Sequence, residues 1–224
     1  GLGGERFSKS AGVKVELGEA VDRFGPDAFR YFLLREVPFD ADGNFSWERF
    51  EERYTSELAD AFGNLASRVL AMLERYRGGV VPSAADATPL DRFGDAALER
   101  YAAAMDSLLL HRGAAAAWEL VAEANAFVER QAPWTLAKRG DDAALDSTLA
   151  ALARALLRLA VLAAPFMPTS ADALSAALGQ GEKLPLRGAW ERALAPVLAG
   201  AQTRRIPPLF PKPERTSDSA GSSG

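Results

Sequence analysis

The sequence predicts an all-α fold, an antiparallel helical bundle, on three observations. Apolar residues recur at helical spacing along most of the 224 residues, and capping residues or glycines stand where the periodic stretches begin and end. Strand-like alternation is confined to residues 11–16, and no internal repeat is present. A hydrophobic content of 48% is ample for a buried core. We therefore expect helices packed on helices.

The first expected elements are short. Residues 1–16 carry Gly, Ser and Lys without a sustained period, which predicts a mobile loop. A helix over 17–24 is stopped by Gly25, and a proline at the first helical position then opens a second helix over 26–36. The composition of residues 40–44 predicts a turn.

A long helix is expected over 47–77. Ser46 is a suitable N-cap for it, and Gly78 and Gly79 follow its last turn. Gly63 lies in its middle, where glycine costs about 1 kcal/mol relative to alanine. This position therefore predicts a kink or a close approach of another segment.

The second half of the chain predicts more helices, which cover 89–110, 112–131, 133–138, 142–164 and 169–179. Residues 184–201 are expected to be irregular or weakly helical. Residues 206–211 are expected to be extended, because their prolines lack backbone donors. The Ser/Gly/Asp tail over 215–224 predicts disorder.

Composition limits the chemistry. The chain has no cysteine and one histidine, His111, which effectively excludes zinc, and we expect no metal bound by this segment. The net charge of -4 and a pI near 5.2 argue against a broad basic field, so any RNA contact must be local. The chain begins with glycine and has no apolar leader, which favours a piece of a longer cytoplasmic protein.

The most apolar stretch, residues 149–167, contains Arg154 and Arg158 one turn apart. This charged stripe predicts a core helix with a solvated or RNA-facing edge, and no membrane span.

Two separated patches indicate a reader of RNA bases. Asn64 and Arg68 lie four residues apart on one helical face, and Trp134 follows a proline that breaks the backbone after Gln131. Each patch also has an ordinary explanation, because amide–guanidinium pairs are common on solvated helix edges and tryptophans are commonly buried. A third patch, residues 6–10, is a Ser/Lys loop that suits phosphate, or is an ordinary solvated loop.

The order of these landmarks resembles a known family. Arg6-Phe7-Ser8-Lys9-Ser10 with the helix that follows is similar to the Lys-Met-Ser-Lys-Ser loop of class I aminoacyl-tRNA synthetases. The landmarks that continue the resemblance to methionyl-tRNA synthetases, up to about residue 214, are residues 35–39, 42–46, 64–68, 131–134, 164–168 and 208–211.

The resemblance implies a role for the loop in the use of ATP, with magnesium accompanying the nucleotide. Lys9 is implied to stabilise the charge that develops on the triphosphate while methionine is adenylated, with Arg6, Ser8 and Ser10 in the same loop. Arg6 and Phe7 depart from the usual Lys-Met but keep a positive charge followed by an apolar side chain.

The resemblance also implies that the helical part binds the anticodon loop of methionine tRNA. Asn64 and Arg68 would hydrogen-bond bases of the CAU anticodon, chiefly its first cytosine, and Trp134 would stack on that base. The supporting residues are Pro133, which fixes the backbone, Asn125, which orders the junction by hydrogen bonding, and Lys138, which with Arg139 meets phosphates.

These expectations divide the chain into the end of a catalytic domain (1–45), a helical anticodon-binding domain (46–214) and the tail (215–224). The whole enzyme would attach methionine to its tRNA with ATP, whereas this segment alone lacks a His-x-Gly-His signature and should not activate methionine. The alternatives are a helical module that binds protein, and the equivalent part of another class I synthetase.

Overall fold

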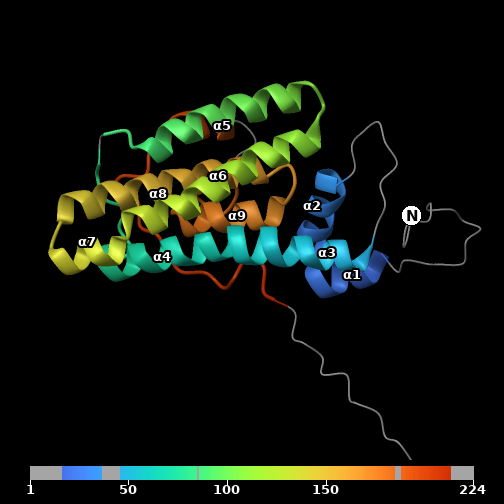
Figure 1. The fold of residues 1–224 in the computed structure, drawn as a ribbon, viewed down its shortest axis with the longest axis horizontal. Helices are drawn as coiled ribbons and strands as arrows, with labels where there is room; N and C mark the ends of the chain where they lie inside the picture. Colours follow the sequence, from blue (N-terminus) through green and yellow to red (C-terminus); the bar gives the residue numbers. More distant parts are fainter. Residues whose placement is uncertain (1–16, 37–45, 85, 185–187, 213–224) are drawn as a thin grey trace, which may run out of the picture.

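The computed structural model describes residues 17–36, 46–84, 86–184 and 188–212 (Figure 1). Its helices are α1 (Leu17–Phe24), α2 (Pro26–Glu36), α3 (Trp47–Arg53), η1 (Tyr54–Gly63), α4 (Asn64–Arg77), α5 (Pro89–Asp106), α6 (Leu110–Gln131), α7 (Pro133–Arg139), α8 (Asp142–Ala163), α9 (Pro168–Ala177) and α10 (Ala189–Leu194). Extended pairing in these residues is limited to an isolated bridge between Val80 and Gln202. The predicted all-α class is confirmed. The loop expected over 1–16, the turn over 40–44 and the tail over 215–224 lie outside the described residues.

The central helix of the bundle is α8. Between Leu149 and Ala163 every one of its side chains is buried except that of Arg154. It packs against α4, α5, α6, α7, α9 and α10, and Figure 1 shows α5 and α4 along opposite edges with α6, α8 and α9 between them. Burial on all sides explains why this segment is the most apolar of the chain.

Capping residues start several helices as predicted. Ser46 Oγ accepts a hydrogen bond from the backbone N–H of Arg49 (3.2 Å), and Thr88 forms a reciprocal capping box with Asp91. Helix α5 ends at Asp106, earlier than predicted, because Leu108 adopts a left-handed φ of 58°. The segment over 184–201, expected to be irregular or weakly helical, contains the short helix α10.

Arg154 and Arg158 correct one prediction. Both guanidinium groups face the interior, where Arg154 makes two 2.7 Å bonds to the Asp91 carboxylate. Arg158 is 4% exposed and donates to the Asp91 carbonyl (2.7 Å) and to the Ala193 carbonyl (3.0 Å). The prediction of a solvated or RNA-facing edge was wrong, because two carboxylates of α5 pair with these charges, that of Asp91 with Arg154 and that of Asp95 with Arg158 (2.5 Å).

The C-terminal segment returns along α4 toward α3, below it in Figure 1. The Tyr54 hydroxyl donates to the Pro211 carbonyl (2.6 Å), and Phe210 is buried beside Phe62. A Cβ on Gly63 would lie 3.6 Å from the Phe210 ring and 3.0 Å from the Leu58 carbonyl oxygen. The close approach predicted at Gly63 is therefore confirmed.

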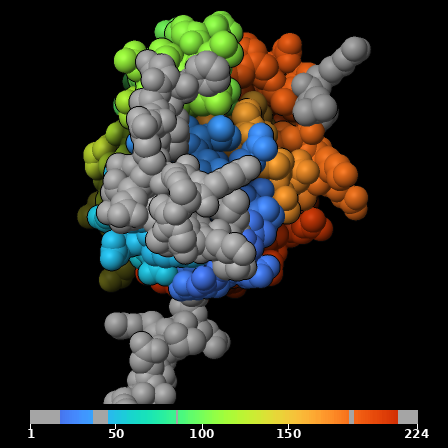
Figure 2. All heavy atoms as spheres, turned by 90° about the vertical axis from the view of Figure 1, so that its right-hand side faces the viewer, coloured from blue at the N-terminus to red at the C-terminus, as the bar shows by residue number. Residues whose placement is uncertain are grey.

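Helices α1 and α2 close one end of the bundle. Figure 2 shows them from that end, in blue, with the turn between α5 and α6 above them in green. Tyr31 and Phe32 of α2 are fully buried in the same hydrophobic core as α6 and α8. The Arg30 guanidinium donates to the Pro165 carbonyl (3.0 and 3.1 Å), which ties α2 to the segment between α8 and α9.

Candidate nucleic-acid interface

The junction of α6 and α7 presents Trp134 at the surface. A residue that precedes proline disfavours the α conformation, and Ala132 accordingly leaves α6 with a left-handed φ of 44°. Pro133 is buried as the first residue of α7, whereas the next side chain, Trp134, is 45% exposed. The broken backbone thus directs an indole out of the bundle, which is the exposure that base stacking requires.

Asn64 and Arg68 lie one turn apart at the start of α4. Asn64 is exposed. The Arg68 guanidinium is 33% exposed and forms a 2.6 Å ion pair with Glu129 in the last turn of α6, five residues before Trp134. The structure thus places Arg68 against the end of α6 that leads to the indole.

Glu129 contacts the candidate site, and the sequence analysis did not single it out. Its carboxylate is 61% exposed, so the pair with Arg68 stands in solvent. Nothing in the spacing of an isolated glutamate points to this role, because the pairing depends on how α4 and α6 pack. Contacts of α6 with η1 at Glu57 and Ala61, and with α4 at Arg68, follow one another in the same order along both segments, so α6 runs in the same direction as the η1–α4 helix.

Asn125 supports a different element from the one predicted. Its amide donates to the carbonyl oxygens of Ala61 (3.2 Å) and Val121 (3.0 Å). It therefore links α6 to η1, and its hydrogen bonds do not reach the junction at residues 131–134. The hydrogen bonds of Asn125 thus hold the turn that precedes Asn64, and not the junction that the sequence analysis assigned to it.

Positive charge near Trp134 is local. Lys138 and Arg139 are exposed in the last turn of α7, and in the part of the chain that the structure describes neither forms an ion pair. Arg130 and Arg77 are neutralised by Glu123 and by Asp142 with Asp146. Lys138 and Arg139 are thus available to an anionic partner next to Trp134.

The predicted phosphate loop cannot be located here. Arg6, Ser8, Lys9 and Ser10 lie outside the described residues. Within the described residues, no group of three or more His, Asp or Glu side chains could hold a metal ion. No described helix combines the length and the apolar character needed to cross a membrane.

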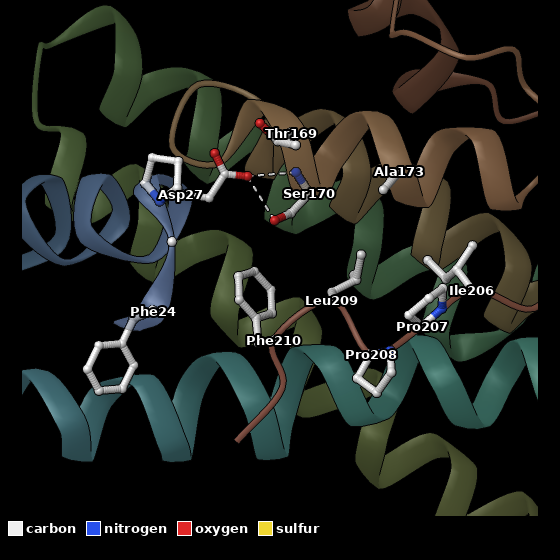
Figure 3. Close-up of a pocket in the computed structure, with 12 residues that line it drawn as sticks. Phe24, Asp27, Thr169, Ser170, Ala173, Ile206, Pro207, Pro208, Leu209 and Phe210 are labelled. Carbon is white, nitrogen blue, oxygen red and sulfur yellow. Dashed lines mark hydrogen bonds between the residues drawn. The ribbon is translucent and has the colours of Figure 1, made fainter. Parts of the chain in front are cut away.

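A hollow of about 380 Å³ lies between the α1–α2 turn, the start of α9 and residues 206–210 (Figure 3). Its polar groups bond to one another, because Asp27 Oδ2 accepts from the Ser170 backbone N–H (2.6 Å) and hydroxyl (2.8 Å). The Asp27 carboxylate thereby caps the N-terminus of α9. Of the predicted site residues that the structure describes, none lines this hollow.

Comparison with known families decides which group the chain belongs to. The family described as the anticodon binding domain of methionyl tRNA ligase matches residues 81–219, and the family of class I (M) tRNA synthetases matches residues 1–70. The chain belongs to the methionyl-tRNA ligase family. The resemblance inferred from the sequence is confirmed.

Methionine–tRNA ligases of known sequence match this chain along most of its length. A methionine–tRNA ligase of Brucella melitensis is 40% identical over 215 residues, which are 93% of this chain and 41% of the relative. One from Caldanaerobacter subterraneus is 37% identical over 217 residues, which are 94% of this chain and 34% of the relative. The chain thus spans well under half the length of these relatives.

Solved structures agree as well. Methionyl-tRNA synthetase of Mycobacterium tuberculosis in complex with methionyl-adenylate superposes with a TM-score of 0.83 at 33% identity, covering 94% of this chain and 42% of that one. The free form of the same enzyme gives a TM-score of 0.80 at 32% identity over 88% of this chain and 41% of that one. The helical arrangement is therefore that of the family.

Proposed function

We propose that this chain is the C-terminal part of a methionine–tRNA ligase, and that α4, the end of α6 and α7 together read the CAU anticodon of methionine tRNA. The observation that carries the proposal is the exposed indole of Trp134 beside the helix end that holds Arg68. The family of the chain supplies the substrate class, since the matched domain is one that binds an anticodon.

The chemistry of the exposed groups suits a splayed cytosine. Stacking of a base on an aromatic ring contributes roughly 1 to 3 kcal/mol and leaves the edges of the base free to be read. An arginine fork donates to the carbonyl and ring nitrogen of cytosine, and an asparagine amide both donates and accepts. In this proposal Trp134 holds the base while Arg68 and Asn64 read its edge.

The ion pair of Arg68 with Glu129 fits this role. Exposed pairs contribute only about 0 to 1 kcal/mol, so Arg68 can exchange Glu129 for a base at little cost. Until then the carboxylate holds the long side chain beside the end of α6. Lys138 and Arg139 would meet phosphates of the anticodon loop.

The activity of the whole enzyme is part of the proposal. Attachment of methionine to tRNA with ATP needs the remainder that the relatives carry and this chain does not span. Lys9, with Arg6, Ser8 and Ser10, would contribute to ATP binding, with magnesium bound to the nucleotide. We keep the division at residues 45 and 214 as part of this proposal, and a role in translation implies the cytoplasm.

A titration tests the recognition step. The purified chain is titrated with two anticodon stem-loops, one with CAU and one with its first base changed to U, at about 0.15 M salt because RNA affinity depends on salt. We expect tighter binding of the CAU hairpin. Trp134→Ala should weaken binding by roughly 1 to 3 kcal/mol, and Arg68→Ala should remove most of the discrimination, both with unchanged helicity.

Matched controls separate this outcome from general surface effects. Arg100→Ala removes an exposed ion pair with Glu119 (2.9 Å) elsewhere in the bundle, and Val197→Ala truncates another exposed apolar side chain. Neither should change binding. Equal affinity of the unaltered chain for both hairpins contradicts the proposal and leaves a helical protein-binding module as the alternative.

A further inference from the structure

The helix that carries Asn64 and Arg68 contains a π-helical segment directly before them. Residues Tyr54–Gly63 form η1, which joins α3 to α4 without a break. The backbone N–H of Asn64 donates to the Ala59 carbonyl, a bond of the i→i+5 type that closes the last π turn. π-Helical structure is rare, and π turns within α-helices lie frequently at functional sites.

The large buried side chains of this segment recur at a wider spacing than one α-helical turn, and the small residues Ala59 and Gly63 beside them are buried too. Phe50, Tyr54, Leu58 and Phe62 are buried at intervals of four residues. Four residues of an α-helix turn about 40° beyond a full turn, so an uninterrupted α-helix would carry this row away from the core. The wider π turn keeps the row buried, and it also decides the direction in which the next residues, Asn64 and Arg68, point.

Two side chains of α6 bond to the backbone of η1. Trp118 Nε1 donates to the Glu57 carbonyl (3.2 Å), and Asn125 Nδ2 donates to the Ala61 carbonyl (3.2 Å). The Ala61 carbonyl also accepts from the backbone N–H of Asn64. Asn125 and the backbone of Asn64, a proposed base-reading residue, therefore bond to the same carbonyl oxygen.

Packing of aromatic rings and an ion pair add to these hydrogen bonds. The Trp118 ring stacks on Tyr31 with centroids 4.4 Å apart and meets Phe62 edge-on at 5.7 Å. The Glu57 carboxylate pairs with Arg53 (2.7 Å) and accepts a hydrogen bond from the Tyr31 hydroxyl. Burial and the neighbouring Glu57 carboxylate raise the pKa of Tyr31 well above its ordinary value, so its hydroxyl stays protonated as the donor.

We propose that Trp118 and Asn125 are positioning residues for anticodon recognition: their hydrogen bonds hold η1 in its π form and thereby set the face from which Asn64 and Arg68 meet the RNA. This inference rests on the function proposed above. It assigns to α6 two roles in one site, since α6 also carries Glu129 and leads to Trp134.

The test compares Trp118→Phe, Asn125→Leu and the double variant in the full chain. Trp118→Phe keeps an aromatic ring without the indole N–H, and Asn125→Leu replaces the amide, with its bonds to the Ala61 and Val121 carbonyls, by an apolar side chain of similar size. In each variant a carbonyl of η1 loses its side-chain donor. Two readouts are taken: the ratio of affinities for the CAU and the altered hairpin, and hydrogen exchange of the η1 amides. A purely structural loss would lower stability without changing the ratio.

Two variants serve as matched controls. Trp190→Phe changes a tryptophan that stacks on Tyr101 away from η1, and Thr148→Val removes a hydroxyl bond to the Ala144 carbonyl within α8. Both are expected to lower the melting temperature while the affinity ratio and the exchange of η1 amides stay unchanged.

We expect each single variant to lower the affinity ratio by about tenfold, the effect of one lost hydrogen bond in the upper range, and to speed exchange of the η1 amides. An unchanged ratio in Asn125→Leu and Trp118→Phe overturns the inference while the proposed function stands. If the unaltered chain binds both hairpins equally, the proposed function fails. In that case, unchanged hydrogen exchange of the η1 amides in the variants would overturn the inference that Trp118 and Asn125 hold η1. The single variants decide the matter if the double variant does not fold.

Discussion

Two arginines of the bundle, Arg68 and Arg154, each pair with one carboxylate on a neighbouring helix, yet the two pairs differ in exposure and geometry. The Arg68–Glu129 pair is 33% and 61% exposed and consists of one 2.6 Å contact. The Arg154–Asp91 pair is 16% and 9% exposed and bidentate, with both bonds at 2.7 Å. Arg154 is therefore held by a buried partner, whereas Arg68 can exchange its exposed partner at little cost.

The difference in burial predicts a difference in the cost of breaking each ion pair. A buried pair that loses one partner leaves an uncompensated charge in the interior, whereas an exposed pair returns both charges to water. The network around Arg154 should therefore govern stability without affecting RNA, and the surface around Arg68 should govern RNA with little effect on stability. Substitutions in the two regions test this difference between Arg154 and Arg68.

The largest effect is expected from Asp91→Ala. This change strands the Arg154 guanidinium and removes the capping box of α5, so the free energy of unfolding should fall by about 3 to 5 kcal/mol. Urea denaturation measures it. A loss below about 1 kcal/mol would show that the buried pair is dispensable and would erase the contrast with Arg68.

Gly94→Ala should be next. A Cβ at this position would lie 2.2 Å from Arg158 Nη1, so the arginine must shift, at a cost of about 1 to 3 kcal/mol. The matched control is Gly18→Ala in α1, where no atom lies within 4 Å of the added Cβ and helix propensity should stabilise by about 0.5 to 1 kcal/mol. Thermal unfolding measures the change in stability of both variants. A change of the same sign in Gly94→Ala and Gly18→Ala would contradict the prediction.

Acid should reveal the same network. Burial alone would raise the pKa of Asp91, but the hydrogen bonds from Arg154 and Thr88 outweigh it and hold the pKa below its ordinary value of 3.8. A carboxylate with a lowered pKa in the folded state contributes stability above its ordinary value, and this contribution is lost as the pH falls through the folded pKa. Stability measured from pH 6 down to about pH 3 should therefore fall less steeply in Asp91→Asn than in the unaltered chain. Parallel profiles would contradict this assignment.

A smaller effect is expected from the two left-handed residues at opposite ends of α6. Ala132→Gly and Leu108→Gly both relieve a positive φ and should each leave stability unchanged or raise it by up to about 1 kcal/mol. Only Ala132→Gly should weaken binding of the CAU hairpin, by a few fold, because the backbone before Trp134 becomes freer. Weaker binding by Leu108→Gly as well would contradict a local role for Ala132.

The smallest change in stability is expected from Glu129→Gln. Loss of an exposed pair should alter the free energy of unfolding by less than about 1 kcal/mol. The same denaturation experiment used for Asp91→Ala measures it, and a loss as large as that of Asp91→Ala would show that the exposed pair belongs to the fold.

The elements that follow local rules were predictable from the sequence. Caps at Ser46 and Thr88 and the glycine at Gly78 mark helix boundaries through chemistry within a few residues. The break before Pro133 and its exposed neighbour Trp134 follow from the same kind of rule. Candidate site residues tied to these breaks were therefore found without coordinates.

Features that depend on packing between helices were not predictable. Arg154 and Arg158 resemble a solvated stripe in the sequence, and only the approach of α5 and α10 shows that they are paired inside. The partner of Arg68 is hidden for the same reason. The π segment is visible in the sequence as large apolar residues every four positions from Phe50 to Phe62. Such a spacing within a long helix can indicate a π turn.

The central claim is that Arg68 reads the first anticodon base while Trp134 holds it. A double-mutant cycle tests this most directly: affinities are measured for the unaltered chain and for Arg68→Ala, each with the CAU hairpin and with the hairpin whose first base is U. We expect a coupling free energy of roughly 1.5 to 3 kcal/mol between Arg68 and that base, as for hydrogen bonds to a charged group. A coupling of zero, with Arg68→Ala weakening both hairpins equally, would contradict it.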